Sequence, residues 1–268
     1  MLGQLPPSCY VDQCIFELER TRLFGRLWIF AGLTHSVAAP DQFITCEIAG
    51  RHVVVQNFDG VLKAFENVCL HRGKLIHTER SGCRPPVCGY HGWRYGPDGC
   101  VRTIPFEREC YRFEDDERRA LRLREFAVRI IGTLIFVNVD TDPLPLEHQF
   151  EPDFIAALES ASNAFDDQFL VARWRRPFNW KLAYENLRDA VHPRFVHTKS
   201  LNLEATFPLS DGSAHGQDSV VRPKSSLSAL SYGGAEGELR CTAPPPFASW
   251  VERWGTEDAY FNWLPFTN

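Results

Sequence analysis

Two short segments of the chain each carry one cysteine and one histidine at metal-ligand spacing. One residue separates Cys69 from His71, and two residues separate Cys88 from His91. Two thiolates and two imidazoles presented as two mixed pairs suit an asymmetric [2Fe–2S] cluster, in which one iron takes both thiolates and the other takes both imidazoles. Replacing two anionic ligands by neutral ones raises the reduction potential. The predicted chemistry is therefore electron transfer.

A structural zinc site is the main alternative for the same four residues, because two cysteines and two histidines also suit tetrahedral Zn²⁺. Zinc sites usually present two cysteines and then two histidines, each pair closely spaced. Here cysteine and histidine alternate along the chain, and the first pair has a one-residue spacer. A visible spectrum separates the two, since an iron–sulfur cluster is brown and zinc is colourless.

A second group of candidate ligands lies further along the chain, at His192 and His197. Five residues rotate an ideal helix by about 500°, so the two rings would not share a helix face. Pro193 disfavours helical geometry at His192, so the helix should kink or end there and let His197 swing back. Two histidines and one carboxylate form the facial triad of non-haem Fe(II) oxygenases, which leaves positions open for O₂ and substrate.

Both groups resemble the Rieske non-haem iron oxygenases, the alpha subunits of aromatic-ring-hydroxylating and demethylating oxygenases. The stretch CLHRGKLIHTERSGCRPPVCGYHGWRYGPDGCVRTIP carries the C-x-H-R-G and C-x-x-H-G-W boxes of their Rieske domain. The stretch ENLRDAVHPRFVH matches their E-N-x-x-D-x-x-H-x-x-x-x-H motif. The resemblance implies an α+β fold, with an all-β Rieske domain and a helix-on-antiparallel-sheet (helix-grip-like) catalytic domain. It also implies a Rieske cluster and a mononuclear Fe(II).

Residues inside the two boxes refine the comparison. Rieske proteins of respiratory chains carry an extra cysteine in each loop, and a disulfide joins them. The matching positions here are Lys74 and Tyr90, so the chain resembles the lower-potential oxygenase or ferredoxin type. We expect glycines to let the loop backbone approach the cluster and aromatic rings to pack beneath it; these residues are Gly73, Gly92, Trp93 and Tyr95.

The resemblance also implies roles for Asp189 and Asn186. In the family, the carboxylate that matches Asp189 links a cluster histidine of one subunit to an iron-ligand histidine of the next. By this analogy Asp189 would bond His91 of a neighbouring subunit and His192 of its own. Asn186 lies about one turn earlier and is expected to support it. A homotrimer, or an alpha3beta3 assembly, follows from the resemblance.

The carboxylate of the triad is the part of the family pattern that does not appear. In the family it lies well over a hundred residues after the second histidine, and this chain ends 71 residues after His197. Three interpretations stay open: the sequence is a fragment, the gene is truncated, or a nearer acid substitutes. The nearer acids are Asp211, Asp218, Glu252, Glu257 and Asp258. We expect a C-terminally incomplete oxygenase and nominate no third ligand.

The elements that must position these residues follow from local patterns. Residues 11–24 predict an amphipathic helix. Between 41 and 140, β-rich runs such as HVVVQNF, VLKAF, AVRII and TLIFVNV predict a small antiparallel sandwich or barrel. Residues 141–152 look like a linker, and 152–163 and 178–192 predict helices. The domains expected are 1–40, a helical segment packing on the catalytic domain; 41–145, the Rieske domain; and 146–268, a partial catalytic domain.

Composition argues against some classes of function. The 268 residues carry a formal net charge of −5 and no block of Lys and Arg, so nucleic-acid binding is not expected. No apolar run is long enough to span a bilayer, so no membrane association is expected. The N-terminus lacks the basic and apolar segments of a secretory signal, so we expect a cytoplasmic protein.

The resemblance implies the terminal component of an oxygenase. Electrons from NAD(P)H would pass through a partner reductase, with or without a ferredoxin, to the cluster and then to Fe(II). There O₂ would be activated for hydroxylation or oxidative demethylation of a small aromatic substrate. The alternative from another class is a Rieske electron-transfer protein with an incomplete, non-catalytic second domain. Iron content separates them, since three irons per chain indicate the oxygenase and two indicate the electron carrier.

Overall fold

The computed structural model describes residues 5–163, 165, 177–188 and 196. The chain divides into two compact units, Met1–Arg173 and Trp174–Thr267, which are described separately. The first unit holds both predicted ligand loops. Of the second unit, the described part consists mainly of one helix, α6 (Trp180–Arg188).

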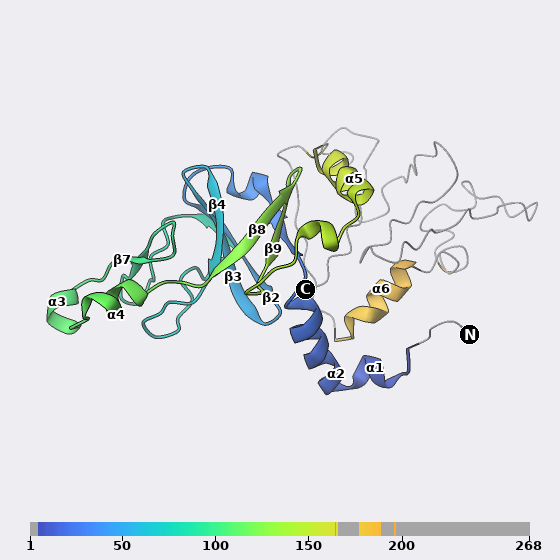
Figure 1. Ribbon diagram of the computed structural model, residues 1–268, viewed down its shortest axis with the longest axis horizontal. Helices are drawn as coiled ribbons and strands as arrows, with labels where there is room; N and C mark the ends of the chain where they lie inside the picture. Colours follow the sequence, from blue (N-terminus) through green and yellow to red (C-terminus); the bar gives the residue numbers. More distant parts are fainter. Residues whose placement is uncertain (1–4, 164, 166–176, 189–195, 197–268) are drawn as a thin grey trace, which may run out of the picture. The chain divides into compact units, whose positions relative to one another are not determined.

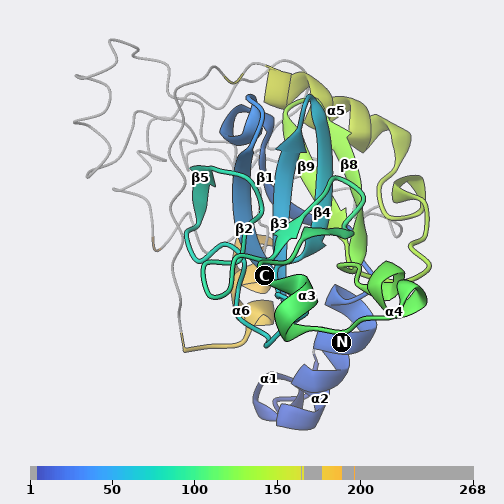
Figure 2. The same ribbon diagram turned by 90° about the vertical axis from the view of Figure 1, so that its left-hand side faces the viewer.

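The first unit is built on a seven-stranded antiparallel sheet with the strand order β1-β9-β8-β4-β3-β2-β5. Figures 1 and 2 show this sheet from two directions. A separate pair joins β6 (Arg94–Tyr95) to β7 (Val101–Thr103). The strands of the large sheet are β1 Ile29–Leu33, β2 Gln42–Ile48, β3 Arg51–Phe58, β4 Val61–Glu66, β5 Ser81–Cys83, β8 Glu125–Ile131 and β9 Leu134–Asn138.

Strand β3 shows why both faces of the sheet are covered. Its five consecutive residues 53–57 are buried, as a strand needs when it has packed cores on both sides. Because side chains alternate across a strand, Val53 and Val55 enter one core and Val54 enters the other. The core that contains Val54 also contains Cys69 and Cys88. The sheet therefore forms one wall of the predicted cluster site.

The predicted β-rich runs are confirmed, since HVVVQNF, VLKAF, AVRII and TLIFVNV correspond to β3, β4, β8 and β9. Two short helices lie between β7 and β8, and in Figure 1 they extend with β7 from one end of the sheet. These are α3 (Glu107–Cys110) and α4 (Asp115–Ala120).

The single helix predicted over 11–24 is wrong in one respect, because the helix is interrupted. The structure has α1 (Ser8–Val11), α2 (Gln13–Leu18) and a π-helix, η1 (Glu19–Phe24). Asp12 stands between the first two in an extended conformation. Its carboxylate accepts a hydrogen bond from the Cys14 N–H at 2.7 Å, so it ends one helix and caps the next.

The predicted linker 141–152 carries a short 3₁₀ helix, η3 (Leu146–His148), and is anchored to the first unit. Leu146 and Phe150 are both buried, and the Phe150 ring lies 5.6 Å from the ring of Phe136 on β9. The interpretation of this stretch as a linker is therefore wrong, because part of it is buried in the first unit. Two of its apolar side chains, four residues apart, are buried, and one of them packs on a strand of the sheet.

Helix α5 (Pro152–Asn163) is confirmed, and it is bonded to the turn between β8 and β9. The Thr133 N–H donates to the Ser162 hydroxyl at 3.1 Å, and the Thr133 hydroxyl donates to the Ser162 carbonyl at 2.9 Å. Strand β1 belongs to the same sheet although it lies within residues 1–40. The domain boundaries at 40 and 145 stay predictions.

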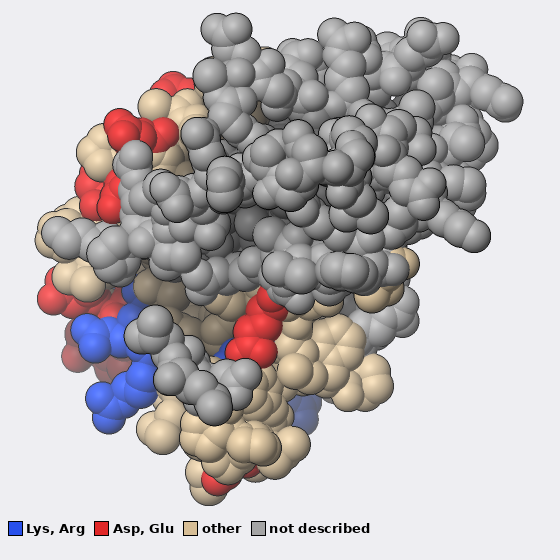
Figure 3. Space-filling model, turned by 90° about the vertical axis from the view of Figure 1, so that its right-hand side faces the viewer, with Lys and Arg blue, Asp and Glu red and all other residues tan. Residues whose placement is uncertain are grey.

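The described surface carries both signs of charge. On the face in Figure 3, Lys and Arg side chains are interspersed with Asp and Glu side chains among the residues that are not grey. Within the part of the chain that the structure describes, no helix is long and apolar enough to cross a membrane.

Candidate metal centre

The two predicted ligand loops share one backbone pattern. In the first loop, the Cys69 N–H donates to the Lys74 carbonyl at 2.8 Å, and the Gly73 N–H donates to the Cys69 carbonyl at 2.9 Å. The second loop repeats both bonds, each at 2.9 Å, with Cys88, Gly92 and Trp93 in the corresponding places. Each loop is thus a closed turn that fixes its cysteine and histidine locally.

Gly73 and Gly92 make these turns possible. Their φ angles are +71° and +72°, in the left-handed region that L side chains rarely adopt. A Cβ at Gly73 would meet nothing within 4 Å, so conformation and not space requires glycine there. A Cβ at Gly92 would also lie 2.9 Å from Cγ of Pro105. The expected close approach of the backbone to a cluster stays a prediction.

Both predicted cysteine ligands are buried, with exposed fractions of 3% for Cys69 and 2% for Cys88. Burial raises the pKa of the Cys69 thiol, and the neighbouring Cys88 thiol adds to the increase. The Tyr95 hydroxyl donates to Sγ of Cys69 at 3.1 Å and accepts from the Leu70 N–H at 3.0 Å. A bound metal ion would offset the burial cost by stabilising the thiolates directly.

The two predicted histidine ligands lie together. The rings of His71 and His91 are 4.5 Å apart, and the His71 ring stacks on Trp93 at 5.0 Å. Burial lowers the pKa of His71, which favours the neutral form of the imidazole, the form that binds metals. Its Nε2 lies 3.2 Å from the Tyr111 hydroxyl, whereas its Nδ1 is buried without a hydrogen-bond partner.

This arrangement fits a [2Fe–2S] cluster better than a single ion. The thiols are close to each other and the imidazoles are close to each other, as expected when each iron takes one kind of ligand. Nδ1 of His71 is buried and has no hydrogen-bond partner, so its lone pair is available to bind a metal ion. Within the described ranges, no three His, Cys, Asp or Glu side chains converge on one ion position, as a tetrahedral zinc site would need.

The two aromatic residues expected beneath the cluster, Trp93 and Tyr95, contact the predicted ligands, and their place beneath a cluster stays a prediction. Trp93 is 2% exposed and stacks on His71, and Tyr95 is 2% exposed and hydrogen-bonded to Cys69. Sequence reasoning missed Tyr111 and Phe113, which complete the aromatic wall around Trp93 at ring distances of 5.6 and 6.2 Å. Both follow α3, a segment for which the family boxes give no signal.

Lys74 and Tyr90, which stand where a loop disulfide would require cysteines, are in contact. The Lys74 ammonium lies 5.7 Å from the centre of the Tyr90 ring, within cation–π range. The Arg72 guanidinium lies at the same distance from this ring. All eight cysteines in the described ranges are free. The contact between the tips of these loops is therefore noncovalent.

The second predicted group of ligands falls outside the residues that the structure describes, apart from Asn186. Asn186 lies on α6 and is exposed. Asp189, His192 and His197 lie outside the described residues, as do the end of the helix predicted over 178–192 and the acids listed as substitutes for the third ligand. The mononuclear iron site stays a prediction.

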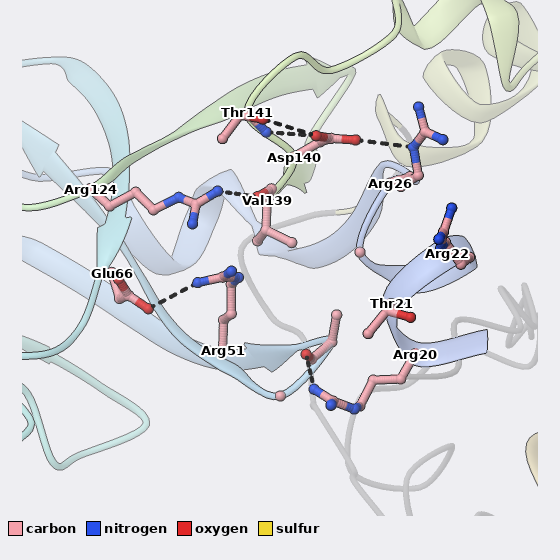
Figure 4. Close-up of a pocket in the computed structure, with 13 residues that line it drawn as sticks. Arg20, Thr21, Arg22, Arg26, Arg51, Glu66, Arg124, Val139, Asp140 and Thr141 are labelled. Atoms are coloured by element: carbon pink, nitrogen blue, oxygen red, sulfur yellow. Dashed lines mark hydrogen bonds and ion pairs between the residues drawn. The ribbon is translucent and has the colours of Figure 1, made fainter. Parts of the chain in front are cut away.

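A pocket of about 530 Å³ with many arginines was not predicted from the sequence. It lies between η1, the β2–β3 turn and the residues that follow β9 (Figure 4). Arg51 pairs with Glu66 at 3.3 Å and Arg26 pairs with Asp140 at 3.2 Å, and these pairs are partly exposed. Such pairs contribute about 0–1 kcal/mol each. The arginines that line it are Arg20, Arg22, Arg26, Arg51 and Arg124.

Known proteins are similar to this chain in sequence and in fold. Residues 27–126 match the Rieske [2Fe-2S] domain model. The chain is 30% identical over 203 residues to the glycine betaine monooxygenase oxygenase subunit of Pseudomonas aeruginosa (strain UCBPP-PA14), which covers 74% of this chain and 45% of that protein. It is 39% identical over 200 residues to the large oxygenase component of a naphthalene 1,2-dioxygenase system of Pseudomonas aeruginosa, covering 71% and 43%.

A solved structure gives the same result for the fold. It is the structure of a quaternary ammonium Rieske monooxygenase, a protein that is associated with carnitine oxidation by gut microbiota and with inter-subunit electron transfer. The TM-score is 0.63 at 27% identity, over 72% of this chain and 54% of that chain. The predicted α+β class is confirmed. The chain spans about half the length of the relatives it matches.

Proposed function

We propose that this chain, whose residues 27–126 belong to the Rieske [2Fe–2S] domain family, is part of the terminal component of an oxygenase. Cys69 and Cys88 would hold one iron of the cluster, and His71 and His91 the other. The observation that carries this assignment is the pairing of thiol with thiol and imidazole with imidazole, beside the partnerless Nδ1 of His71. When bound, the cluster supplies one-electron transfer.

The two histidines have different surroundings, and this difference indicates where the site opens. Nε2 of His71 faces the Tyr111 hydroxyl, and the ring is covered by Trp93. No side chain in the described ranges hydrogen-bonds His91, and its ring neighbour, Tyr90, is 54% exposed. His91 is therefore the histidine whose imidazole can form a hydrogen bond with a residue of another subunit. This supports the proposal that Asp189 of a neighbouring subunit bonds His91.

The proposed destination is a mononuclear Fe(II) held by His192 and His197, with Asp189 and Asn186 beside it. The support is the sequence motif together with the named relatives, all of which are oxygenase components. The reaction would be hydroxylation or oxidative demethylation of a small aromatic substrate. NAD(P)H would supply the electrons through a partner reductase, with or without a ferredoxin. The assembly would be a homotrimer or alpha3beta3, which the inter-subunit transfer named for the solved relative supports.

Iron and sulfide analysis of the purified chain tests both centres. The proposal predicts three irons and two sulfides per chain, with a brown colour. A colourless protein with zinc would overturn the cluster assignment, and two irons with two sulfides would overturn the oxygenase assignment for this chain. In matched variants, Cys69→Ser should lose the cluster, whereas His192→Ala should lose only the third iron.

A further inference from the structure

Four polar side chains lie under the ligand loops without being ligands, and we call them the loop clasp: Gln56, Asn67, His77 and Arg84. The first three are between 1% and 2% exposed. Burying polar groups is costly unless they are hydrogen-bonded, and each of these side chains makes at least one hydrogen bond, although Nδ1 of His77 has no partner among the described residues.

Asn67 closes the first ligand loop. It lies two residues before Cys69, and its side chain forms two hydrogen bonds to the backbone of His77, where the loop returns to the sheet. The Asn67 amide donates to the His77 carbonyl at 2.7 Å, and the His77 N–H donates to the Asn67 side-chain oxygen at 2.9 Å. The two ends of the loop are therefore joined by one side chain.

Arg84 joins the first loop to the second. One arm of its guanidinium donates to the carbonyl of Val87, the residue before Cys88, at 3.2 Å. The other arm donates to the Ile76 carbonyl at 3.0 Å and to the Glu79 carboxylate at 3.1 Å. A planar fork with five N–H donors can bridge these acceptors, whereas a lysine ammonium on a flexible stem cannot hold the same geometry.

Gln56 fixes the clasp to β3. Its amide donates to the Arg84 carbonyl at 2.8 Å, and its side-chain oxygen lies 3.2 Å from Nε2 of His77. The His77 ring stacks on Phe43 of β2 at 3.8 Å. The clasp therefore attaches both ligand loops to the same sheet, through β3 and β2.

We propose that the loop clasp, with Arg84 as its bridging member, positions the two ligand loops relative to each other. The inference rests on the ligand assignment proposed above. Under that assignment each iron takes one ligand from each loop, since Cys69 and Cys88 come from different loops, as do His71 and His91. A shift between the loops would therefore distort both irons. Lys74 and Tyr90 join the loop tips only by a noncovalent contact, so the clasp adds the buried hydrogen bonds that hold the separation at the base of the loops.

The test compares Arg84→Gln and Arg84→Lys with Arg80→Gln in the full 268-residue chain carrying its cluster. Arg80 is exposed, lies in the same segment and carries the same charge, so it controls for loss of a cation. Cluster loss is followed as bleaching of the visible absorbance in the presence of a chelator. Because three hydrogen bonds from a charged donor are lost, Arg84→Gln should bleach roughly tenfold faster or more. Arg84→Lys should be intermediate, and Arg80→Gln should match the wild type.

The electron paramagnetic resonance spectrum of the reduced cluster separates positioning from general stability. Its lines should broaden in both Arg84 variants, because the loops adopt a range of separations, and stay sharp in Arg80→Gln. Adding Lys74→Cys with Tyr90→Cys to Arg84→Lys should restore sharp lines once the disulfide has formed. Unbroadened lines in Arg84→Lys, or broadened lines in Arg80→Gln, would overturn the proposal. A Cys69→Ser chain that keeps its cluster would instead refute the ligand assignment.

Discussion

Removal of the Tyr95 hydroxyl should lower the reduction potential of the cluster. This hydroxyl donates to Sγ of Cys69 at 3.1 Å, and it is 2% exposed. Burial raises the pKa of Tyr95 above its ordinary value, so the group stays a donor throughout the working pH range. A hydrogen bond to a ligand sulfur stabilises the reduced cluster more than the oxidised one, because the reduced cluster carries more negative charge.

The size of the shift follows from the strength of that bond. A buried hydrogen bond to a charged acceptor contributes about 1.5–3 kcal/mol, and we assign about 1 kcal/mol of it to the difference between oxidation states. For a one-electron couple, tenfold corresponds to about 59 mV, so about 1 kcal/mol corresponds to roughly 40 mV. Tyr95→Phe should therefore lower the midpoint potential by about 40 mV.

The assay is a redox titration with mediators, followed by circular dichroism in the visible range. Tyr90→Phe is the matched control, since the Tyr90 ring lies beside His91 but is 54% exposed. It should leave the potential unchanged. A Tyr95→Phe potential equal to that of the wild type, or an equal decrease in both variants, would refute the assigned role of the hydroxyl.

Three further predictions concern the first unit. Burial lowers the pKa of His77 to about 4, so the unfolded chain binds the extra proton first as the pH falls from 6.5 to 4. The free energy of unfolding of the apoprotein should drop by up to roughly 3 kcal/mol across that window, measured by denaturant titration, and His77→Gln should lack this dependence. Ser162→Ala should lower the melting temperature by about 3 °C through the lost bond to Thr133, which calorimetry measures. Chelation of iron should speed hydrogen exchange in loops 69–74 and 88–93 but not in β9, as mass spectrometry can show.

The ligand loops were predictable because their information is local. The spacing of Cys69 to His71 and of Cys88 to His91 can be recognised in the sequence without any knowledge of the fold. Each loop then closes through backbone hydrogen bonds within six residues. The β-rich runs were predictable for a similar reason, since β3 and β9 contain the short apolar runs 53–55 and 134–137. The wall formed by Tyr111 was not predictable, because it joins His71 from forty residues away.

The misinterpreted segments show where local patterns fail. One helix was predicted over 11–24, although the Asp12 carboxylate caps a helix that begins at the next residue. The prolines of the stretch 141–152 indicate a linker, but Leu146 and Phe150 are buried on the sheet. Burial of these two depends on tertiary packing, which a propensity cannot supply. The loop clasp escaped prediction for the same reason, since isolated polar residues such as Gln56 look like surface positions.

The noncovalent contact of Lys74 and Arg72 with Tyr90 has a consequence for how the cluster is installed. A disulfide between the loop tips can hold them together only after two thiols have been oxidised, and a reducing environment would break it. Here the tips meet through charge and an aromatic face, which form as soon as the chain folds. Insertion of the cluster can therefore take place where thiols stay reduced. Under those conditions the two cysteines remain available as ligands for iron.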